Sequence, residues 1–150
     1  MPEAIDWARL AAYIDGEGYI RVATGKTHSG RLEVNVSNTD YRLLEWLKST
    51  FGGNVYVGSR KGPAQKKLLW RWVVDRSNAE RILAGCLPYF IVKREQAECG
   101  LSFQRIISTQ NANGEPKKGH KISLIARAER DAITSKLHEA RSIGTMRVAS

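Results

Sequence analysis

The chain contains one pattern twice: two short segments typical of β-strands and then a helix, first at 19–50 and again at 54–85. In the first unit, residues 31–37 alternate strictly between apolar and polar side chains. This alternation is typical of a strand that buries one face and exposes the other. Two hairpins, each followed by a helix, predict a four-stranded antiparallel sheet with helices on one face, which is an α+β fold.

Helices are expected to flank both hairpins. Asp6, Asp40 and Ser77 are predicted N-caps, because short polar side chains accept hydrogen bonds from the first free amides of a helix. The expected helices span about 7–15, 41–50, 77–85, 93–107 and 122–140. Residues 109–119 are polar and predict a loop. A chain of 150 residues is long enough for a core of its own, so we expect a single domain over 1–150.

The formal net charge of +9 is distributed unevenly. Residues 1–20 hold four acids and one Arg, whereas residues 21–76 hold eleven basic and four acidic side chains. An acidic island in a basic chain predicts a cation site within a surface that binds a polyanion. Nucleic acid is the favoured partner. A basic protein without a specific ligand, or one that binds an anionic membrane surface, is the alternative.

The sequence favours an intracellular protein, cytoplasmic or organellar. Cys86 and Cys99 lack the spacing of a metal motif and are expected to be reduced, packed thiols. No apolar run reaches the roughly 18–20 residues of a membrane span. The first residues do not combine a basic stretch with an apolar one, so a leader is not expected either.

One face of the predicted sheet is rich in polar and basic side chains. We expect it to consist of Arg21, Arg31, Glu33, Asn35, Ser37, Tyr56, Arg60, Lys67 and Arg71. This face is either the ordinary solvated side of a sheet or a platform that reads DNA, and the excess of Arg and Lys favours the platform. Arg and Asn suit the edges of guanine and adenine, while Lys suits phosphate.

Further DNA contacts are expected from two connecting segments. Lys26 and His28 fall in the first hairpin turn. A basic stretch in the polar loop either touches phosphates or is simply solvated, and it comprises Lys117, Lys118, His120 and Lys121. Trp70 and Trp72 alternate with basic residues, which is typical of base stacking, but the strand phase favours a place in the core.

The first predicted helix ends in two carboxylates and two glycines. Asp15 and Glu17 stand where the helix end carries a partial negative charge, at a cost of roughly 0.3–1 kcal/mol each. A positive partner is therefore expected, and a metal ion is a good candidate. One face of this helix would let a second helix approach closely, because its side chains are small. That face consists of Ala8, Ala11, Ala12 and Asp15.

The nine residues from Leu10 to Gly18 resemble the LAGLIDADG motif of homing endonucleases, although Ala12 stands where a glycine is common. Two further segments are similar to that family: Val36-Ser37-Asn38-Thr39-Asp40, and the K-x-x-Q-A stretch that begins at Lys93. The resemblance covers nearly the whole chain and implies an αββαββα core with a four-stranded DNA-binding sheet and C-terminal helices. One copy of the motif implies a homodimer on near-palindromic double-stranded DNA, with the motif helices packed across the two-fold axis.

The resemblance also implies hydrolysis of both DNA strands with a divalent metal, normally Mg²⁺. Mn²⁺ is expected to substitute, and Ca²⁺ is expected to bind without supporting cleavage. Glu17 matches the metal-binding acid, where the family usually has Asp, and the Gly16 carbonyl would be a second ligand. The alternative for Glu17 is an exposed surface acid. Asp15 is expected to serve in capping or in the interface rather than as a ligand.

Four more residues receive roles from the same resemblance. Asn38 would orient the attacking water, and Arg42 would line the pocket as a basic residue. Lys93 would lie near the scissile phosphate, although an ungapped alignment to some members puts their lysine at Glu95. Gln96 is expected either to line the pocket or to be an amide on the helix surface.

The leading hypothesis is therefore a homing endonuclease of the intron or intein type. We expect it to have neither a membrane partner nor a small-molecule substrate. The alternative is a non-cleaving protein on the same fold, either an RNA maturase or a DNA-binding regulator. A third possibility is a basic structural RNA-binding protein in which the motif is accidental. Metal-dependent cleavage that is lost in Glu17→Gln separates the three hypotheses.

Overall fold

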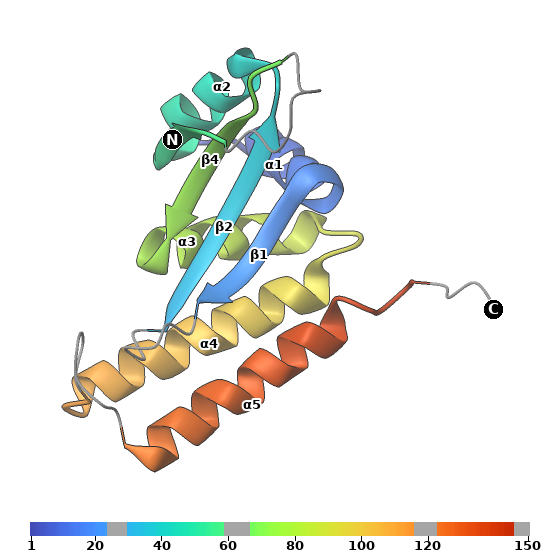
Figure 1. The fold of residues 1–150 in the computed structure, drawn as a ribbon. Coiled ribbons are helices and arrows are strands. Elements are labelled where there is room, and N and C mark those ends of the chain that lie inside the picture. The colour runs from blue at the N-terminus through green and yellow to red at the C-terminus, as the bar shows by residue number, and fades with distance from the viewer. Residues whose placement is uncertain (24–29, 59–66, 116–122, 146–150) are drawn as a thin grey trace.

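A computed structural model describes residues 1–23, 30–58, 67–115 and 123–145 of the chain (Figure 1). Four strands form one sheet in the order β1-β2-β4-β3, and all neighbours are antiparallel. The strands are β1 (Gly18–Ala23), β2 (Arg31–Asn38), β3 (Asn54–Val57) and β4 (Trp70–Asp75). The predicted four-stranded antiparallel sheet is confirmed.

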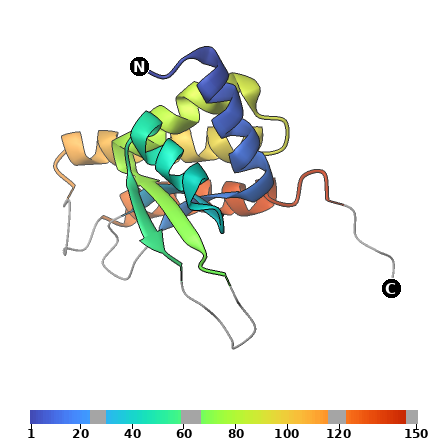
Figure 2. The ribbon, with the colours of Figure 1, turned by 90° about the horizontal axis from the view of Figure 1, so that it is seen from above.

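Helices cover one face of this sheet and leave the other open (Figures 1 and 2). They are α1 (Ala4–Glu17), α2 (Tyr41–Phe51), α3 (Arg76–Cys86), the 3-10 turn η1 (Leu87–Tyr89), α4 (Arg94–Ala112) and α5 (Leu124–Ala140). The first three lie behind the sheet in Figure 1, α4 crosses below them, and α5 runs beside α4. The fold is therefore the expected α+β arrangement with an αββαββα core and C-terminal helices.

The alternation in β2 decides which side chains form the core. Leu32, Val34 and Val36 are fully buried under the helices. Trp72 on the neighbouring strand β4 is also fully buried, and its indole N–H donates to the Gly52 carbonyl at 2.7 Å. Trp70 is partly buried against the same core. The prediction that the two tryptophans belong to the core is confirmed.

The helix caps were predicted less well than the helices. Asp40 is the N-cap of α2, and its carboxylate accepts from the Arg42 amide at 3.0 Å. Asp6 is not an N-cap, because α1 begins three residues earlier after Glu3, whose amide donates to the Asp6 carboxylate at 3.0 Å. The prediction of Ser77 as an N-cap was also wrong, because α3 begins at Arg76 and its N-cap is Asp75.

The helix α4 extends into the region predicted as a polar loop. It runs to Ala112 because Gln110 is buried against α5, where its amide donates to the Ala126 carbonyl at 3.1 Å. Arg130 of α5 returns a hydrogen bond to Gln110 at 2.7 Å. Contacts with a distant helix therefore stabilise a stretch whose composition indicated a loop.

Both cysteines are free thiols, Cys86 buried and Cys99 partly buried. Burial raises the pKa of the Cys86 thiol to about 12, and the charge of Asp15 adds to this effect. Within the described residues, no helix is long and apolar enough to cross a membrane.

Candidate nucleic-acid interface and acidic site

Glu17 and Asn38 meet where α1 passes into β1 and where β2 ends. The Asn38 amide nitrogen donates to the Glu17 carboxylate at 2.9 Å, and the Asn38 amide oxygen accepts from the Asp40 backbone at 2.8 Å. Both ends of the amide are thus engaged, which determines its orientation. Glu17 remains exposed to solvent. The structure places Asn38 where it can orient Glu17.

Arg42 lies beside this pair and is bound to Asp40. Its guanidinium donates to both carboxylate oxygens, at 3.0 and 2.6 Å, while 88% of the Arg42 side chain stays exposed. These side-chain hydrogen bonds, together with the one from the Arg42 amide, lower the pKa of Asp40 to about 2. The sequence predicted Asp40 as a cap but missed it as the partner of Arg42. A surface hollow surrounds them, lined by Arg9, Tyr13, Asn38, Asp40, Arg42, Leu43 and Trp46.

Lys93 does not point into that hollow. Its ammonium group donates to the last carbonyls of α1, to Ile14 at 2.6 Å and to Asp15 at 2.9 Å. Burial lowers the pKa of Lys93, while the negative charge of Asp15 acts in the opposite direction. The helix end therefore has a positive partner inside the chain, besides the metal ion that the sequence indicated. The expected place of Lys93 near the scissile phosphate stays a prediction.

Asp15 completes the same contact from the other side. Its carboxylate accepts from three successive backbone amides, those of Ile91, Val92 and Lys93, at 2.9, 3.2 and 2.9 Å. These amides precede α4, so Asp15 ties the end of α1 to the start of α4. The expected capping role agrees with these contacts, and Asp15 is engaged within its own chain.

Two predicted site residues are buried instead of accessible. Gln96 on α4 is 7% exposed, so it is not a surface amide, and the alternative that it lines the pocket stays a prediction. Ala11 is fully buried in the core and has no surface to offer a second chain. Ala12 is exposed and Ala8 partly so. Gly16 also faces open space, because no atom of the described residues, beyond its chain neighbours and the backbone of its own helix, lies within 4 Å of the position that a side chain would take. The accessible small face of α1 thus runs through Ala8, Ala12 and Gly16.

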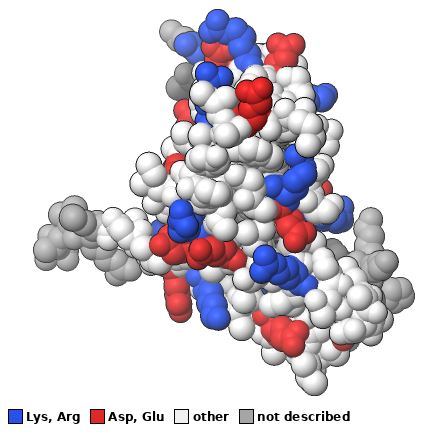
Figure 3. Space-filling view, turned by 180° about the vertical axis from the view of Figure 1, so that it is seen from behind, with Lys and Arg blue, Asp and Glu red and all other residues white. Residues whose placement is uncertain are grey.

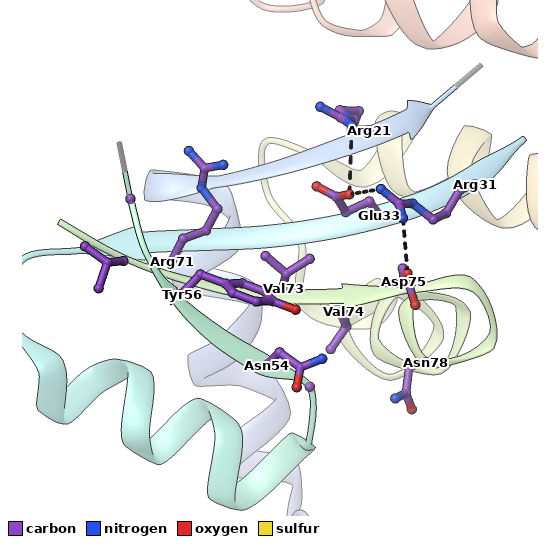
Figure 4. Close-up of a pocket in the computed structure, with 13 residues that line it drawn as sticks. Arg21, Arg31, Glu33, Asn54, Tyr56, Arg71, Val73, Val74, Asp75 and Asn78 are labelled. Atoms are coloured by element: carbon purple, nitrogen blue, oxygen red, sulfur yellow. Dashed lines mark hydrogen bonds and ion pairs between the residues drawn. The ribbon is translucent and has the colours of Figure 1, made fainter. Parts of the chain in front are cut away.

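The open face of the sheet carries a hollow lined by predicted DNA-contact residues (Figure 4). The predicted residues that line it are Arg21, Arg31, Glu33, Tyr56 and Arg71. Asn35 belongs to the same face, since its amide donates to Glu33 at 3.4 Å, and Ser37 pairs with Arg71 across the strands. Lys67 is exposed but precedes β4. The remaining predicted contacts lie outside the described residues: Lys26, His28, Arg60, Lys117, Lys118 and Lys121.

Acids and guanidinium groups pair within this hollow. Arg31 lies 3.1 Å from Glu33 and 3.7 Å from Asp75, and Arg21 lies 4.0 Å from Glu33. The sequence did not predict Asp75, because only the pairing of β2 with β4 brings it beside Glu33. Figure 3 shows the opposite side of the molecule, where basic and acidic side chains are interspersed around an uncharged area.

No family model and no curated protein matches the chain. Several solved structures match its fold. The homing endonuclease I-CvuI, in complex with its target in 2 mM Ca, is 18% identical with a TM-score of 0.68, over 97% of this chain and 87% of that one. The archaeal intron-encoded I-Vdi141I, complexed with DNA, is 13% identical with a TM-score of 0.70, over 99% and 91%.

A longer protein with the same fold is the LAGLIDADG meganuclease I-CpaMI bound to uncleaved DNA. It is 11% identical with a TM-score of 0.64, and all of this chain covers 52% of it. The agreement extends over the sheet, the motif helix and the later helices, because the matches to all three proteins span 97–100% of this chain. The chain therefore has the fold of the LAGLIDADG homing endonucleases.

Proposed function

We propose that the protein is a site-specific endonuclease that cuts both strands of double-stranded DNA with a divalent metal ion. One observation carries this proposal. Glu17 is an exposed acid held by the Asn38 amide at 2.9 Å, at one end of a sheet whose open face carries Arg21, Arg31 and Arg71. The fold supports the choice, since proteins that share it were solved in complex with DNA.

The residues around Glu17 fit a magnesium ion. The described residues contain no group of three or more His, Cys, Asp or Glu that would form an all-protein metal cage. Mg²⁺ does not need one, because it is usually bound by one or two carboxylates together with water and substrate phosphates. Glu17 supplies the carboxylate, and its exposed side chain leaves room for water and a substrate phosphate. When bound, the ion would offset charge on the phosphate and make water more acidic.

The chain's own residues prepare this site. Asn38 holds the Glu17 carboxylate, and Lys93 with Asp15 fixes the end of α1 that carries it. Arg42 is presented at the surface by Asp40, where it can contact a DNA phosphate. Guanidinium groups are well suited to that contact because their donors match the geometry of phosphate oxygens.

A homodimer follows from the requirement to cut two strands. Each chain contributes one Glu17, so two chains supply one acid for each strand. The exposed small residues Ala12 and Gly16 lie on the same side of α1 and would let a second copy of the helix approach closely. Light scattering should then give about twice the 16.8 kDa mass of one chain, and a monomer at micromolar concentration would contradict this part of the proposal.

Cleavage is tested on a plasmid substrate. The plasmid carries the DNA that flanks the gene of this protein on its two sides, joined directly, because this junction is the site into which the gene would have been inserted. With Mg²⁺, the wild-type protein should linearise the plasmid, and Glu17→Gln should reduce cleavage by about 10²–10³-fold or more while retaining DNA binding, since loss of a group that stabilises the transition state costs at least this much. Glu45→Gln, which alters an exposed acid on α2, is the matched control and should cleave normally.

The contrary results are equally specific. Normal cleavage by Glu17→Gln would remove the metal assignment. A wild-type protein that binds the plasmid or the corresponding RNA without cutting, in either Mg²⁺ or Mn²⁺, would favour the alternative of a maturase or a regulator. If the protein is an endonuclease, we expect it to bind the plasmid in Ca²⁺ without cutting it.

A further inference from the structure

The hollow on the open face of the sheet contains a row of charges across three strands. Arg21 of β1 pairs in register with Glu33 of β2, and Glu33 pairs with Asp75 of β4. Two acids that face each other on adjacent strands repel. Arg31 lies against both, 3.1 Å from Glu33 and 3.7 Å from Asp75, and thus offsets this repulsion (Figure 4).

Glu33 is unusual on this face because it is only 8% exposed. A buried carboxylate needs partners, and Glu33 has them in Arg31 at 3.1 Å, the Asn35 amide at 3.4 Å and Arg21 at 4.0 Å. The two arginines remain accessible, with 48% of the Arg21 side chain and 37% of the Arg31 side chain exposed. The acid is therefore covered by guanidinium groups that themselves face solvent.

This arrangement changes what the two arginines can do. Three arginines pair with the two acids, since Arg76 also lies 3.8 Å from Asp75, so the acids offset most of the positive charge at this end of the face and reduce its attraction for phosphates. A guanidinium has five N–H donors. The Nε of Arg31 is buried without a hydrogen-bond partner among the described residues, so the donors of Arg31 that can reach a ligand are those of its two terminal nitrogens that are not turned toward Glu33 and Asp75. Arg71 on the same face forms no ion pair with any residue that the structure describes, so no acid offsets its charge or fixes its direction, which suits it to attract a phosphate.

We propose that Glu33 is a positioning residue for sequence specificity, which holds Arg21 and Arg31 in the orientation that reads guanine edges in the major groove. Arginine reads guanine through two hydrogen bonds to O6 and N7. By cancelling positive charge, Glu33 also weakens attraction to DNA of any sequence, which is the non-specific part of binding. The inference rests on the proposed DNA-binding function.

The test is a selection from duplex DNA with a randomised centre, carried out with the wild-type protein and with Glu33→Gln. The wild type should enrich a sequence that contains guanine. Glu33→Gln should bind random duplex DNA more tightly at low salt, because an acid is removed, yet lose about 10-fold or more in preference at the guanine positions. Arg71→Ala is the matched control, and it should weaken binding to all sequences with the preference kept.

Arg31→Lys provides a second variant if Glu33→Gln does not fold. It keeps the charge beside Glu33 and Asp75 and removes the planar fork, so it should retain affinity for random DNA and lose the same guanine preference. An unchanged preference in either folded variant, next to a selective wild type, would overturn the inference and leave the proposed function intact. A wild type that enriches no sequence would overturn both.

Discussion

The acidic residues at the two ends of the sheet differ in burial and in their partners. At the end where β1 begins and β2 finishes, Glu17 is exposed and held by a single amide, that of Asn38. At the other end, Glu33 is buried and lies within 4.0 Å of two arginines. An acid covered by guanidinium groups has its counter-charge already, whereas Glu17 remains available for a cation from outside. In a chain with a net charge of +9, most acids can find a basic partner. Among the described residues, Glu17 has no basic hydrogen-bond partner and is the candidate metal ligand, whereas Glu33 has two basic partners and is the proposed positioning residue for them.

The end of α1 shows the same contrast within three residues. Asp15 accepts hydrogen bonds from three backbone amides, while Glu17 points to solvent. The two acids belong to one motif but differ in their contacts: Asp15 joins α1 to the start of α4, whereas Glu17 stays exposed, as the proposed metal ligand must be. Four variants would break or sharpen this comparison.

The largest effect on stability is expected from Asp15→Ala. The variant leaves the amides of Ile91, Val92 and Lys93 without their acceptor. The loss of such a cap, together with the one partly buried donor, the Lys93 amide, costs about 2 kcal/mol. Urea unfolding measures the change. Glu17→Ala is the control two residues away and should change the free energy of unfolding by less than about 0.5 kcal/mol. Equal effects of the two variants would contradict the distinction.

A somewhat smaller effect is expected from Lys93→Met, which keeps an apolar stem and removes the ammonium group. The carbonyls of Ile14 and Asp15 then lose a charged donor at the helix end, at a cost of about 1–2 kcal/mol. Lys136→Met, at an exposed position on α5, is the matched control and should be near neutral. If Lys93→Met unfolds like the wild type and only cleavage falls, Lys93 contacts phosphate instead of positioning α1.

Glu33→Gln should lower stability by about 1 kcal/mol. Gln keeps part of the hydrogen bonding to Arg31 and Asn35 but loses the negative charge. The charge contributes only modestly, because both arginines are partly exposed and solvent screens their attraction to Glu33. Thermal melting at low and at high salt measures the change, and salt should narrow the difference between the variant and the wild type. A difference that does not respond to salt would indicate packing rather than charge.

The smallest effect is a pH dependence that comes from Asp40. Its pKa is lowered to about 2 by Arg42 from a usual value near 3.8, so the carboxylate contributes stability above about pH 4. That contribution is lost as the pH falls toward 2, because the folded state must then be protonated. At neutral pH, the melting temperature of the wild type should be slightly higher than that of Asp40→Asn. The two melting temperatures should become equal near pH 2. A constant gap at all pH values would show that the carboxylate charge is not the cause.

Local patterns predicted the parts of this protein that depend on neighbours in the sequence. The alternation of Leu32, Val34 and Val36 identified both faces of β2, and Asp40 was correctly assigned as the cap of α2. Strand phase also placed Trp72 in the core. These features depend on residues one to four positions apart, whose relative placement is dictated by the backbone geometry of strands and helices.

Partners across the fold were not predictable in this way. The sequence showed that the end of α1 needs a positive charge, but not that Lys93, 79 residues from Ile14, supplies it. It showed an acid and arginines on one sheet face, but not that Asp75 would join them through the β2–β4 register. Burial of Ala11 and Gln96 was missed as well, since the exposure of a helix face depends on which elements pack against it.

The sequence by itself determined the order of strands and helices, the polar face of the sheet and the acidic end of the first helix, because each is a periodic or local property of the chain. Only the tertiary structure decided which acid is satisfied and which stays open. That outcome depends on where distant cations come to lie: Lys93 binds the helix end next to Asp15, Arg31 covers Glu33, and Glu17 faces solvent with an amide as its partner.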